Sequence, residues 1–106
     1  MHQVTPTELA QRLQQDGDKP LLLDVREPHE FRYCRIEGSR SMPMGEVFQR
    51  LEELNPQQET VVICHHGIRS AQIANFLISH GFEKVSNLRG GVAAWASDVD
   101  RGMATY

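Results

Sequence analysis

A cysteine at the end of an apolar run is the residue of this chain best suited to chemistry. Val61–Ile63 has the pattern of a buried strand and ends in Cys64, and a short loop with a glycine at position 67 leads into a helical pattern that begins at Ser70. The carboxyl end of a strand facing the amino end of a helix is where open α/β sheets place their ligands. The arrangement predicts that Cys64 is a nucleophile.

Three features of the loop would favour the thiolate form of this cysteine. A free thiol is only a few per cent ionised at neutral pH. Backbone N–H groups and the helix start at Ser70 stabilise an anion, and Arg69 adds a full positive charge. Gly67 allows the loop to turn its amides inward as an anion-binding nest. From these residues alone, the alternative is that Cys64 is a small buried hydrophobe that completes the strand.

Two histidines, His65 and His66, stand directly after the cysteine. Neighbouring residues in a tight loop cannot all turn toward one ion, and structural zinc sites use ligands that are spaced along the chain. The chain offers no second His or Cys pair with suitable spacing, so we expect no metal and no cofactor. We expect one histidine to line the pocket mouth and the other to face solvent, without a preference between them.

The surrounding pattern predicts the elements that position the loop. Thr5 can cap a helix with Pro6 at its first position and Glu8 completing a capping box. Further helical patterns lie at residues 46–54 and 70–80, and shorter helical pieces follow Pro28 and residues 90–91. Apolar runs predict strands at residues 21–25, 61–63 and within 82–88, with brief extended pieces at 2–4 and 39–42. Alternating strands and helices predict a three-layer α/β domain with a mostly parallel sheet and helices on both faces.

Length and composition limit the possible classes of protein. The 106 residues predict one domain, with a core over about residues 3–97 and a tail at 98–106. No segment could span a bilayer and the first residues open no signal peptide, so we expect a cytoplasmic protein without a membrane partner. The net charge of −3 argues against a nucleic-acid partner. Four arginines within residues 26–40 are either ion-paired on the surface or form a positive rim for an anion.

The chain has two cysteines, Cys34 and Cys64. Nothing in the sequence suggests an oxidising compartment, so a reactive thiol and a bystander are favoured over a structural disulfide. A resolving role for Cys34, in which it forms a disulfide with Cys64 during the reaction, is an alternative.

Four motifs in the chain resemble, in the right order, the signatures of the rhodanese family. They cover nearly all of residues 3–97, and the four together are much more specific than any one. The matching segments are Leu23–Glu27 with Glu30-Phe31 after it, Ile36–Gly38 with Pro43, Cys64–Ser70, and Leu88–Gly91 running on to Ala94-Trp95.

The resemblance implies a rhodanese fold, with a parallel sheet of about five strands, and sulfurtransferase chemistry. It implies that Cys64 takes sulfur from thiosulfate or a persulfide donor and passes it as a cysteine persulfide to cyanide, a small thiol or a protein thiol. The loop amides would cradle the persulfide, Arg69 would bind the anionic donor, and Asp24 and Arg26 would brace the surroundings. The implied substrate-binding residues are His65, His66, Gly67, Ile68, Arg69 and Ser70.

The match has departures, and other functions remain open. Arg35 stands where the family commonly has histidine, Cys34 beside it is outside the pattern, and Ser39 and Met42 replace more usual residues. Phosphatases and arsenate reductases of related fold have five residues between cysteine and arginine, whereas four separate Cys64 from Arg69, which favours the smaller sulfane sulfur. A further alternative is a sulfur-carrier or docking module for a protein partner.

Overall fold

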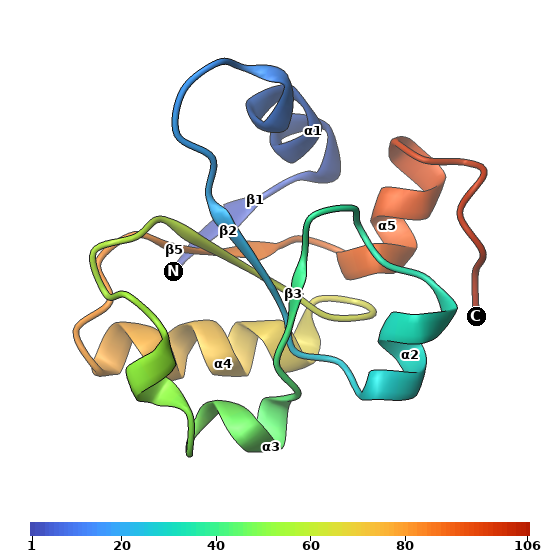
Figure 1. Cartoon of the computed structure of the whole chain (residues 1–106). Helices are drawn as coiled ribbons and strands as arrows, with labels where there is room; N and C mark the ends of the chain where they lie inside the picture. Colours follow the sequence, from blue (N-terminus) through green and yellow to red (C-terminus); the bar gives the residue numbers. More distant parts are fainter.

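The fold is built around a five-stranded sheet, with every pair of neighbouring strands parallel, in the order β1-β5-β4-β2-β3 (Figure 1). The structure is a computed structural model that describes all residues, Met1–Tyr106. Its elements are β1 (His2–Val4), α1 (Pro6–Gln14), β2 (Leu21–Asp24), α2 (Pro28–Tyr33), β3 (Arg40–Ser41), α3 (Met44–Val47), the 3-10 turn η1 (Leu51–Glu53), β4 (Thr60–Ile63), α4 (Ile68–Ser79), β5 (Val85–Leu88) and α5 (Gly91–Asp98).

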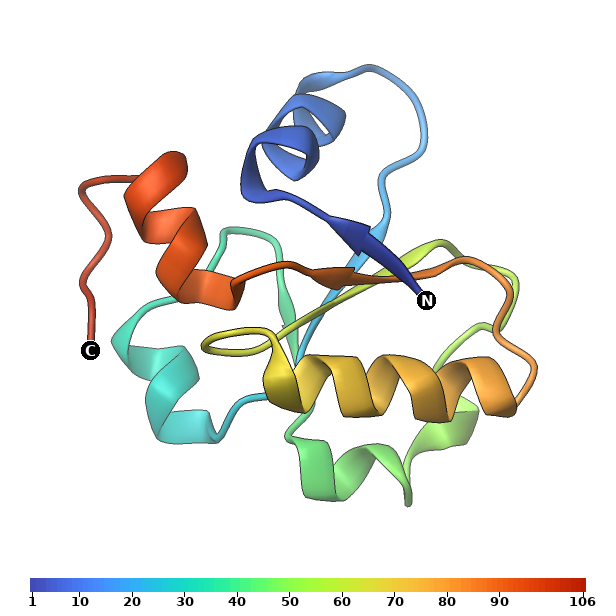
Figure 2. The same ribbon diagram turned by 180° about the vertical axis from the view of Figure 1, so that it is seen from behind.

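Helices cover both faces of this sheet, which confirms the predicted three-layer α/β fold. Helices α3 and α4 lie on one face, and α1 and α5 lie on the other, as the two opposite views show (Figures 1 and 2). None of the helices combines the length and the apolar character needed to cross a membrane.

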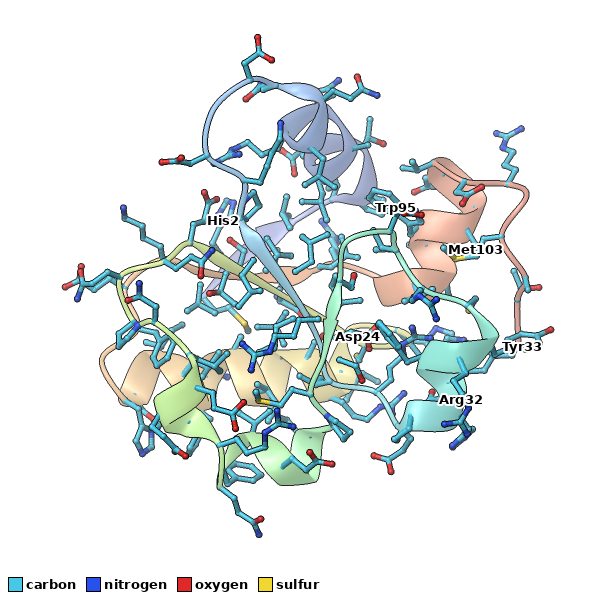
Figure 3. All side chains as sticks on the ribbon, in the orientation of Figure 1. His2, Asp24, Arg32, Tyr33, Trp95 and Met103 are labelled. Carbon is cyan, nitrogen blue, oxygen red and sulfur yellow. The ribbon has the colours of Figure 1, made fainter.

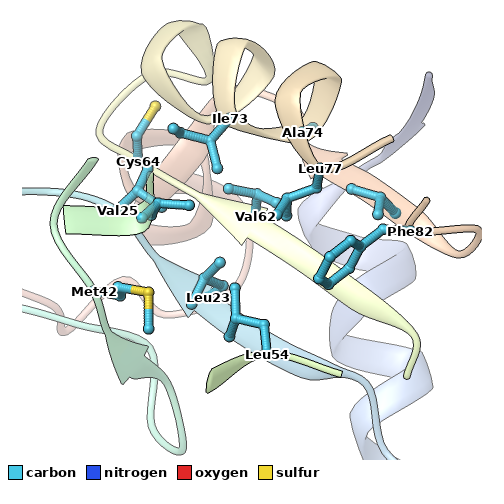
Figure 4. Packing of buried hydrophobic residues seen from close by; sticks show 12 residues of the cluster. Leu23, Val25, Met42, Leu54, Val62, Cys64, Ile73, Ala74, Leu77 and Phe82 are labelled. Atoms are coloured by element: carbon cyan, nitrogen blue, oxygen red, sulfur yellow. The ribbon is translucent and has the colours of Figure 1, made fainter. Parts of the chain in front are cut away.

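Each face of the sheet has its own hydrophobic core because successive side chains of a strand point to opposite sides. On β4, Val62 faces α4 and packs in one cluster with Ile73 and Leu77 of that helix (Figure 4). Val61 and Ile63 face the other way, toward α1 and α5. The core under α3 and α4 consists of Leu23, Val25, Met42, Val47, Leu54, Val62, Cys64, Ile73, Ala74, Leu77, Phe82 and Val85. Because its side chains pack into a core on each face of the sheet, β4 can neither shift along its axis nor turn about it. The position of Cys64, which follows the strand, is therefore fixed as well.

The predicted start of the first helix is confirmed. Thr5 Oγ1 accepts a hydrogen bond from the Glu8 N–H at 3.2 Å, and Glu8 Oε1 accepts one from the Thr5 N–H at 2.8 Å. The two bonds satisfy N–H groups that a helix start otherwise leaves without a partner. The extended piece before it forms the edge strand β1.

Two predicted helices have different bounds in the structure. Residues 46–54 form two short pieces, α3 and η1, rather than one helix. Arg50 leaves the helical conformation between them, and its guanidinium binds Glu46 on one side of the break and Glu53 on the other. Helix α4 begins at Ile68, two residues earlier than predicted, because Gly67 has a φ of 96° and serves as its N-cap. Arg69 and Ser70 are therefore in the first turn of α4.

Candidate active site

Cys64 lies directly after β4, and its sulfur faces the first turn of α4 (Figure 4). Its side chain is almost fully buried, with 1% exposure. The N–H of Gly67 donates a hydrogen bond to the sulfur at 3.1 Å, and Ser70 Oγ lies 3.2 Å from it. The sulfur thus has two polar neighbours from the loop and the start of α4.

The loop keeps this shape because three of its carbonyl groups are bound from outside. The N–H groups of Val92 and Ala93, in the first turn of α5, donate to the carbonyls of Cys64 and His65 at 2.9 and 3.0 Å. The side-chain amide of Asn87 donates to the carbonyl of Gly67 at 3.1 Å. Because the C=O and N–H of a trans peptide point in opposite directions, these bonds turn the following N–H groups into the loop.

The approach of α5 to the loop requires glycine at position 91. Gly91 has a φ of 62°, and a Cβ atom there would lie 2.4 Å from the carbonyl oxygens of both Cys64 and His65. No side chain fits at that distance. This contact gives a structural reason for Gly91 in the closing motif of the sequence.

A buried polar chain runs from the sulfur to the first strand. Ser70 is fully buried, and its hydroxyl donates to Asn87 Oδ1. The orientation of Asn87 follows from its Nδ2 atom, which donates to the carbonyl of Gly67 and to Gln3 Oε1 at 3.0 Å. The single hydroxyl proton of Ser70 is used on Asn87, so the neutral thiol of Cys64 is the donor toward Ser70. Toward a thiolate, the Ser70 hydroxyl can rotate away from Asn87 and donate to sulfur instead.

Arg69, from which the sequence predicts a positive charge beside the loop, forms a bidentate ion pair with Glu30 of α2 through its guanidinium. The distances are 2.8 Å from Nη1 to Oε1 and 3.0 Å from Nη2 to Oε2. The bonds from Arg69 hold the pKa of Glu30 well below its usual range and raise the pKa of Arg69. A thiolate at Cys64 also raises the pKa of Arg69, so the two groups interact electrostatically.

The two histidines differ as expected, and the structure shows which faces inward. The ring of His65 stacks on the ring of Tyr106 with 3.8 Å between centroids and 6° between planes, whereas His66 is exposed. Burial lowers the pKa of His65, and the charge of His66 acts in the same direction. His65, Tyr106 and Cys34 line a cavity of about 70 Å³ beside the loop. No group of three or more His, Cys, Asp or Glu side chains is close enough to hold a metal ion.

Tyr106 connects several residues around the site, although the sequence gives its segment no recognisable pattern. Its hydroxyl donates to Glu30 Oε2 at 2.8 Å and accepts from Arg26 Nη1 at 2.9 Å. Burial raises the pKa of Tyr106 to about 12. The last residues of the chain lie beside α2 (Figures 1 and 2), where Tyr33 packs edge-on against Tyr106.

Asp24, the last residue of β2 (Figure 3), forms a fully buried ion pair with Arg26. Arg26 donates to both Asp24 carboxylate oxygens at 2.7–3.1 Å, and its Nη2 atom donates to the carbonyl of Cys34 at 2.7 Å. These bonds join β2 to the end of α2 and to Tyr106, so the pair braces the wall of the site and does not contact the Cys64 sulfur.

Cys34 and Cys64 lie on opposite faces of the sheet. Cys34 packs in the core with Ile36 and Trp95 on the side of α5, and Cys64 packs with Ile73 on the side of α4. Both are free thiols. A disulfide requires two Cβ atoms within about 4.5 Å that point toward each other, which this placement does not provide.

Of the other predicted binding residues, Gly67 and Ser70 contact the sulfur, while Ile68 is 72% exposed and points into solvent. The sequence reasoning assigned no role to Glu30, Asn87 or Tyr106. Glu30 belongs to the first of the four sequence motifs, so the sequence shows that a carboxylate is present there. The sequence does not show that it pairs with Arg69, which lies 39 positions later. Nothing in the sequence signals Asn87 or Tyr106, because their bonds join segments far apart along the chain.

Comparison with known proteins gives a consistent group of relatives. Residues 5–98 match the family model of the rhodanese-like domain. The chain is 34% identical over 96 residues to a "Sulfurtransferase" of Allochromatium vinosum, covering 91% of this chain and 89% of that protein. It is 40% identical over 86 residues to the "Putative sulfur carrier protein YrkF" of Bacillus subtilis, covering 80% and 46%. It is 30% identical over 80 residues to the "Thiosulfate sulfurtransferase GlpE" of Pseudoalteromonas translucida, covering 76% of each.

A solved structure has the same fold over the whole chain. The rhodanese-like domain protein of Staphylococcus aureus superposes with a TM-score of 0.86 at 26% identity, covering 100% of this chain and 99% of that one. Several of the curated relatives are much longer, and the chain spans 31% and 46% of the length of two of them.

Proposed function

The chain belongs to the rhodanese-like domain family, and on that premise we propose that it transfers a sulfane sulfur through a persulfide on Cys64. The observation that carries the proposal is the surroundings of the sulfur. A thiol at a strand-to-helix turn has a backbone N–H at 3.1 Å and a hydroxyl at 3.2 Å, and both can donate to a thiolate.

In the first half-reaction, the Cys64 thiolate attacks the outer sulfur of thiosulfate. A sulfur–sulfur bond forms to Cys64, the bond between the outer sulfur and the sulfonate sulfur breaks, and sulfite leaves with the electron pair. With a persulfide donor, the same attack on the outer sulfur releases the donor's thiolate. The product in both cases is a persulfide on Cys64, formed without an external oxidant or reductant.

In the second half-reaction, an acceptor takes the outer sulfur. Cyanide attacks that sulfur, the bond to Cys64 breaks, and thiocyanate leaves while the Cys64 thiolate is regenerated. A small thiol or a protein thiolate acts in the same way and becomes a persulfide itself. Because the two half-reactions share one covalent intermediate, ping-pong kinetics are expected.

The chain's own groups have distinct tasks in these steps. The Gly67 N–H and the rotated Ser70 hydroxyl donate to the negative charge on the Cys64 sulfur. The first turn of α5 and Asn87 hold the loop carbonyls away from that charge. The Gly67 N–H already points at the sulfur in the folded loop, so its stabilisation of the charge needs no rearrangement during the reaction.

The decisive experiment is intact-protein mass spectrometry after treatment with thiosulfate. The unaltered chain and Cys34→Ser are expected to gain one sulfur atom, and Cys64→Ser is expected to gain none. Cys34→Ser is the matched control because it removes the other free thiol. A sulfur adduct on Cys64→Ser, or none on the unaltered chain with any sulfane donor, would overturn the proposal.

A second candidate, supported by its similarity to a putative sulfur carrier, is a carrier domain that passes the sulfur to a protein. Ile68, which is 72% exposed on the first turn of α4, offers an apolar contact next to the loop. A carrier would form the Cys64 persulfide once but turn over slowly with cyanide or small thiols. Multiple turnovers with a small acceptor favour the enzyme, and one turnover favours the carrier.

A phosphatase receives less support from the geometry. The arginine that would hold an oxyanion, Arg69, is already bound to Glu30 through both of its terminal nitrogens. No release of phosphate from an aryl phosphate is expected.

A further inference from the structure

The arginine beside the loop is already neutralised by a carboxylate of the same chain. Arg69 is bound to Glu30, and the other nearby arginine, Arg26, is bound to Asp24. The two positive and the two negative charges of these pairs thus compensate one another. Burial lowers the pKa of His65, which disfavours a positive charge on its ring.

Glu30 is fixed in this position by contacts from three directions. Besides the two bonds from Arg69, Oε2 accepts a hydrogen bond from the Tyr106 hydroxyl at 2.8 Å, and Oε1 accepts one from the Glu27 N–H at 2.9 Å. The side chain of Glu30 is only 10% exposed, compared with 34% for Arg69. The carboxylate is part of the packed wall, so an arriving anion cannot displace it from Arg69 without breaking this set of bonds.

A donor with two negative charges is affected more by this pairing than a donor with one. Coulomb energy is proportional to the charge of the donor, so cancelling the field of Arg69 removes twice as much attraction for a dianion as for a monoanion. Thiosulfate is a dianion, and a simple alkyl persulfide carries at most one negative charge. The remaining donors near the sulfur, the Gly67 N–H and the Ser70 hydroxyl, bear no net charge.

We propose that Glu30 determines donor specificity by neutralising Arg69, so that the site discriminates against thiosulfate and favours a persulfide donor of low charge. This inference rests on the proposed sulfur transfer through Cys64 and names its donor class. Glu30 acts through Arg69, and it does not touch the reacting sulfur in any contact of the structure.

The test compares kcat/KM for two donors, thiosulfate and the persulfide of 2-mercaptoethanol, with cyanide as the common acceptor. The variant is Glu30→Gln, which keeps Oε1 as an acceptor for Glu27 and Arg69 but removes the charge. We expect kcat/KM to rise about tenfold with thiosulfate, which equals about 1.4 kcal/mol. Half of that energy gives about threefold with the persulfide, so the ratio between donors shifts about threefold.

The matched control is Glu59→Gln, which removes a carboxylate from another arginine ion pair. Glu59 binds Arg12 at 2.7 Å and lies outside the site. The change in net charge is the same, so an equal shift in this control would mean that overall charge, and not Glu30, is responsible. In the double variant with Arg69→Gln, the gain from Glu30→Gln is expected to disappear, because there is no longer a cation to release.

The outcomes separate this inference from the function on which it rests. If neither donor places a sulfur on Cys64, the proposed function fails. If both donors do so but Glu30→Gln changes both kcat/KM values equally, or neither, the role of Glu30 is overturned. The unaltered chain gives an independent answer should the variant not fold: a higher kcat/KM with thiosulfate than with the persulfide contradicts the proposal.

Discussion

Replacing Gly91 with alanine tests whether α5 shapes the loop that carries Cys64. The added Cβ atom would lie 2.4 Å from two carbonyl oxygens, those of Cys64 and His65. Since real Cβ atoms essentially never come closer than 3.0 Å to such an atom, α5 and the loop must separate by at least 0.6 Å (3.0 minus 2.4). The two bonds most affected are those from the N–H groups of Val92 and Ala93 to the same carbonyls.

The cost can be worked out from these contacts. An alanine in the left-handed region costs about 1–2 kcal/mol. Losing or weakening the bonds from Val92 and Ala93, at about 1 kcal/mol each, brings the total to about 3–4 kcal/mol. That is a large part of the 5–15 kcal/mol by which a domain is typically stable. For a domain of about 100 residues, it corresponds to a Tm lower by roughly 12–30 °C.

Urea unfolding followed by far-UV circular dichroism measures the stability, and mass spectrometry after a short reaction with thiosulfate measures persulfide formation. Gly81→Ala is the matched control, because Gly81 also has a positive φ, 91°, but nothing lies within 4 Å of its Cβ position. The control is expected to lose only the backbone term of about 1–2 kcal/mol and to load sulfur at the normal rate.

The reaction rate separates a damaged loop from a merely weaker fold. The rate is measured without urea, where Gly91→Ala is folded. In this variant α5 no longer holds the loop carbonyls outward, so persulfide formation is expected to slow at least tenfold. Surface substitutions usually change the free energy of unfolding by less than about 0.5 kcal/mol. The reasoning would be refuted if Gly91→Ala unfolded with a free energy within that margin of Gly81→Ala and also formed the persulfide at the normal rate.

Three further predictions follow from the contacts around the sulfur. Ser70→Ala removes one donor to the thiolate and leaves Asn87 Oδ1 buried without its partner. The free energy of unfolding should fall by about 1–3 kcal/mol in urea titrations, and persulfide formation should slow in stopped-flow measurements. An unchanged rate would limit Ser70 to a structural role. Tyr106→Phe deletes the hydroxyl between Arg26 and Glu30 and should lower the free energy of unfolding by about 1.5–3 kcal/mol. Tyr106→Ala should also expose His65 and raise its pKa toward 6.5, measured by NMR titration. An unchanged pKa of His65 would contradict the effect of the stacked ring. The pKa of Glu30 is lowered in the folded state, so its ion pair stabilises the fold above the unfolded pKa near 4.3 and loses that contribution as pH falls below it. The difference in free energy of unfolding between the unaltered chain and Glu30→Gln should therefore shrink between about pH 6 and pH 2. A constant difference would show that the charge is not involved.

The sequence was sufficient for the order of elements and for the position of Cys64 directly after a buried strand. Short apolar runs placed β2, β4 and β5, and the capping box placed the start of α1, because each signal lies within a few neighbouring residues. The same local reasoning identified Cys64 as the residue after a buried strand. It failed at α3, where helical spacing at residues 46–54 did not reveal the break at Arg50.

What the sequence could not give is the pairing of charges across the chain. Local reasoning gives Arg69 a positive charge but no partner, and only the folded structure brings Glu30 to it from 39 positions away. Tyr106 is a stronger example, since its hydroxyl bonds span 76 and 80 positions and its segment has no helical or strand period. Such partners depend on how α2 and the last residues pack, which no short pattern encodes.

The same contacts explain why the loop and the start of α5 stand together as motifs in the sequence. A helix start normally offers free N–H groups that attract anions. In α5, the N–H groups of Val92 and Ala93 are used on the carbonyls of Cys64 and His65, so this helix start is not available to a substrate. The start of α4 alone is left to face the sulfur. The division of tasks follows from Gly91, because only a residue without a Cβ atom lets α5 come close enough to bind the loop from behind.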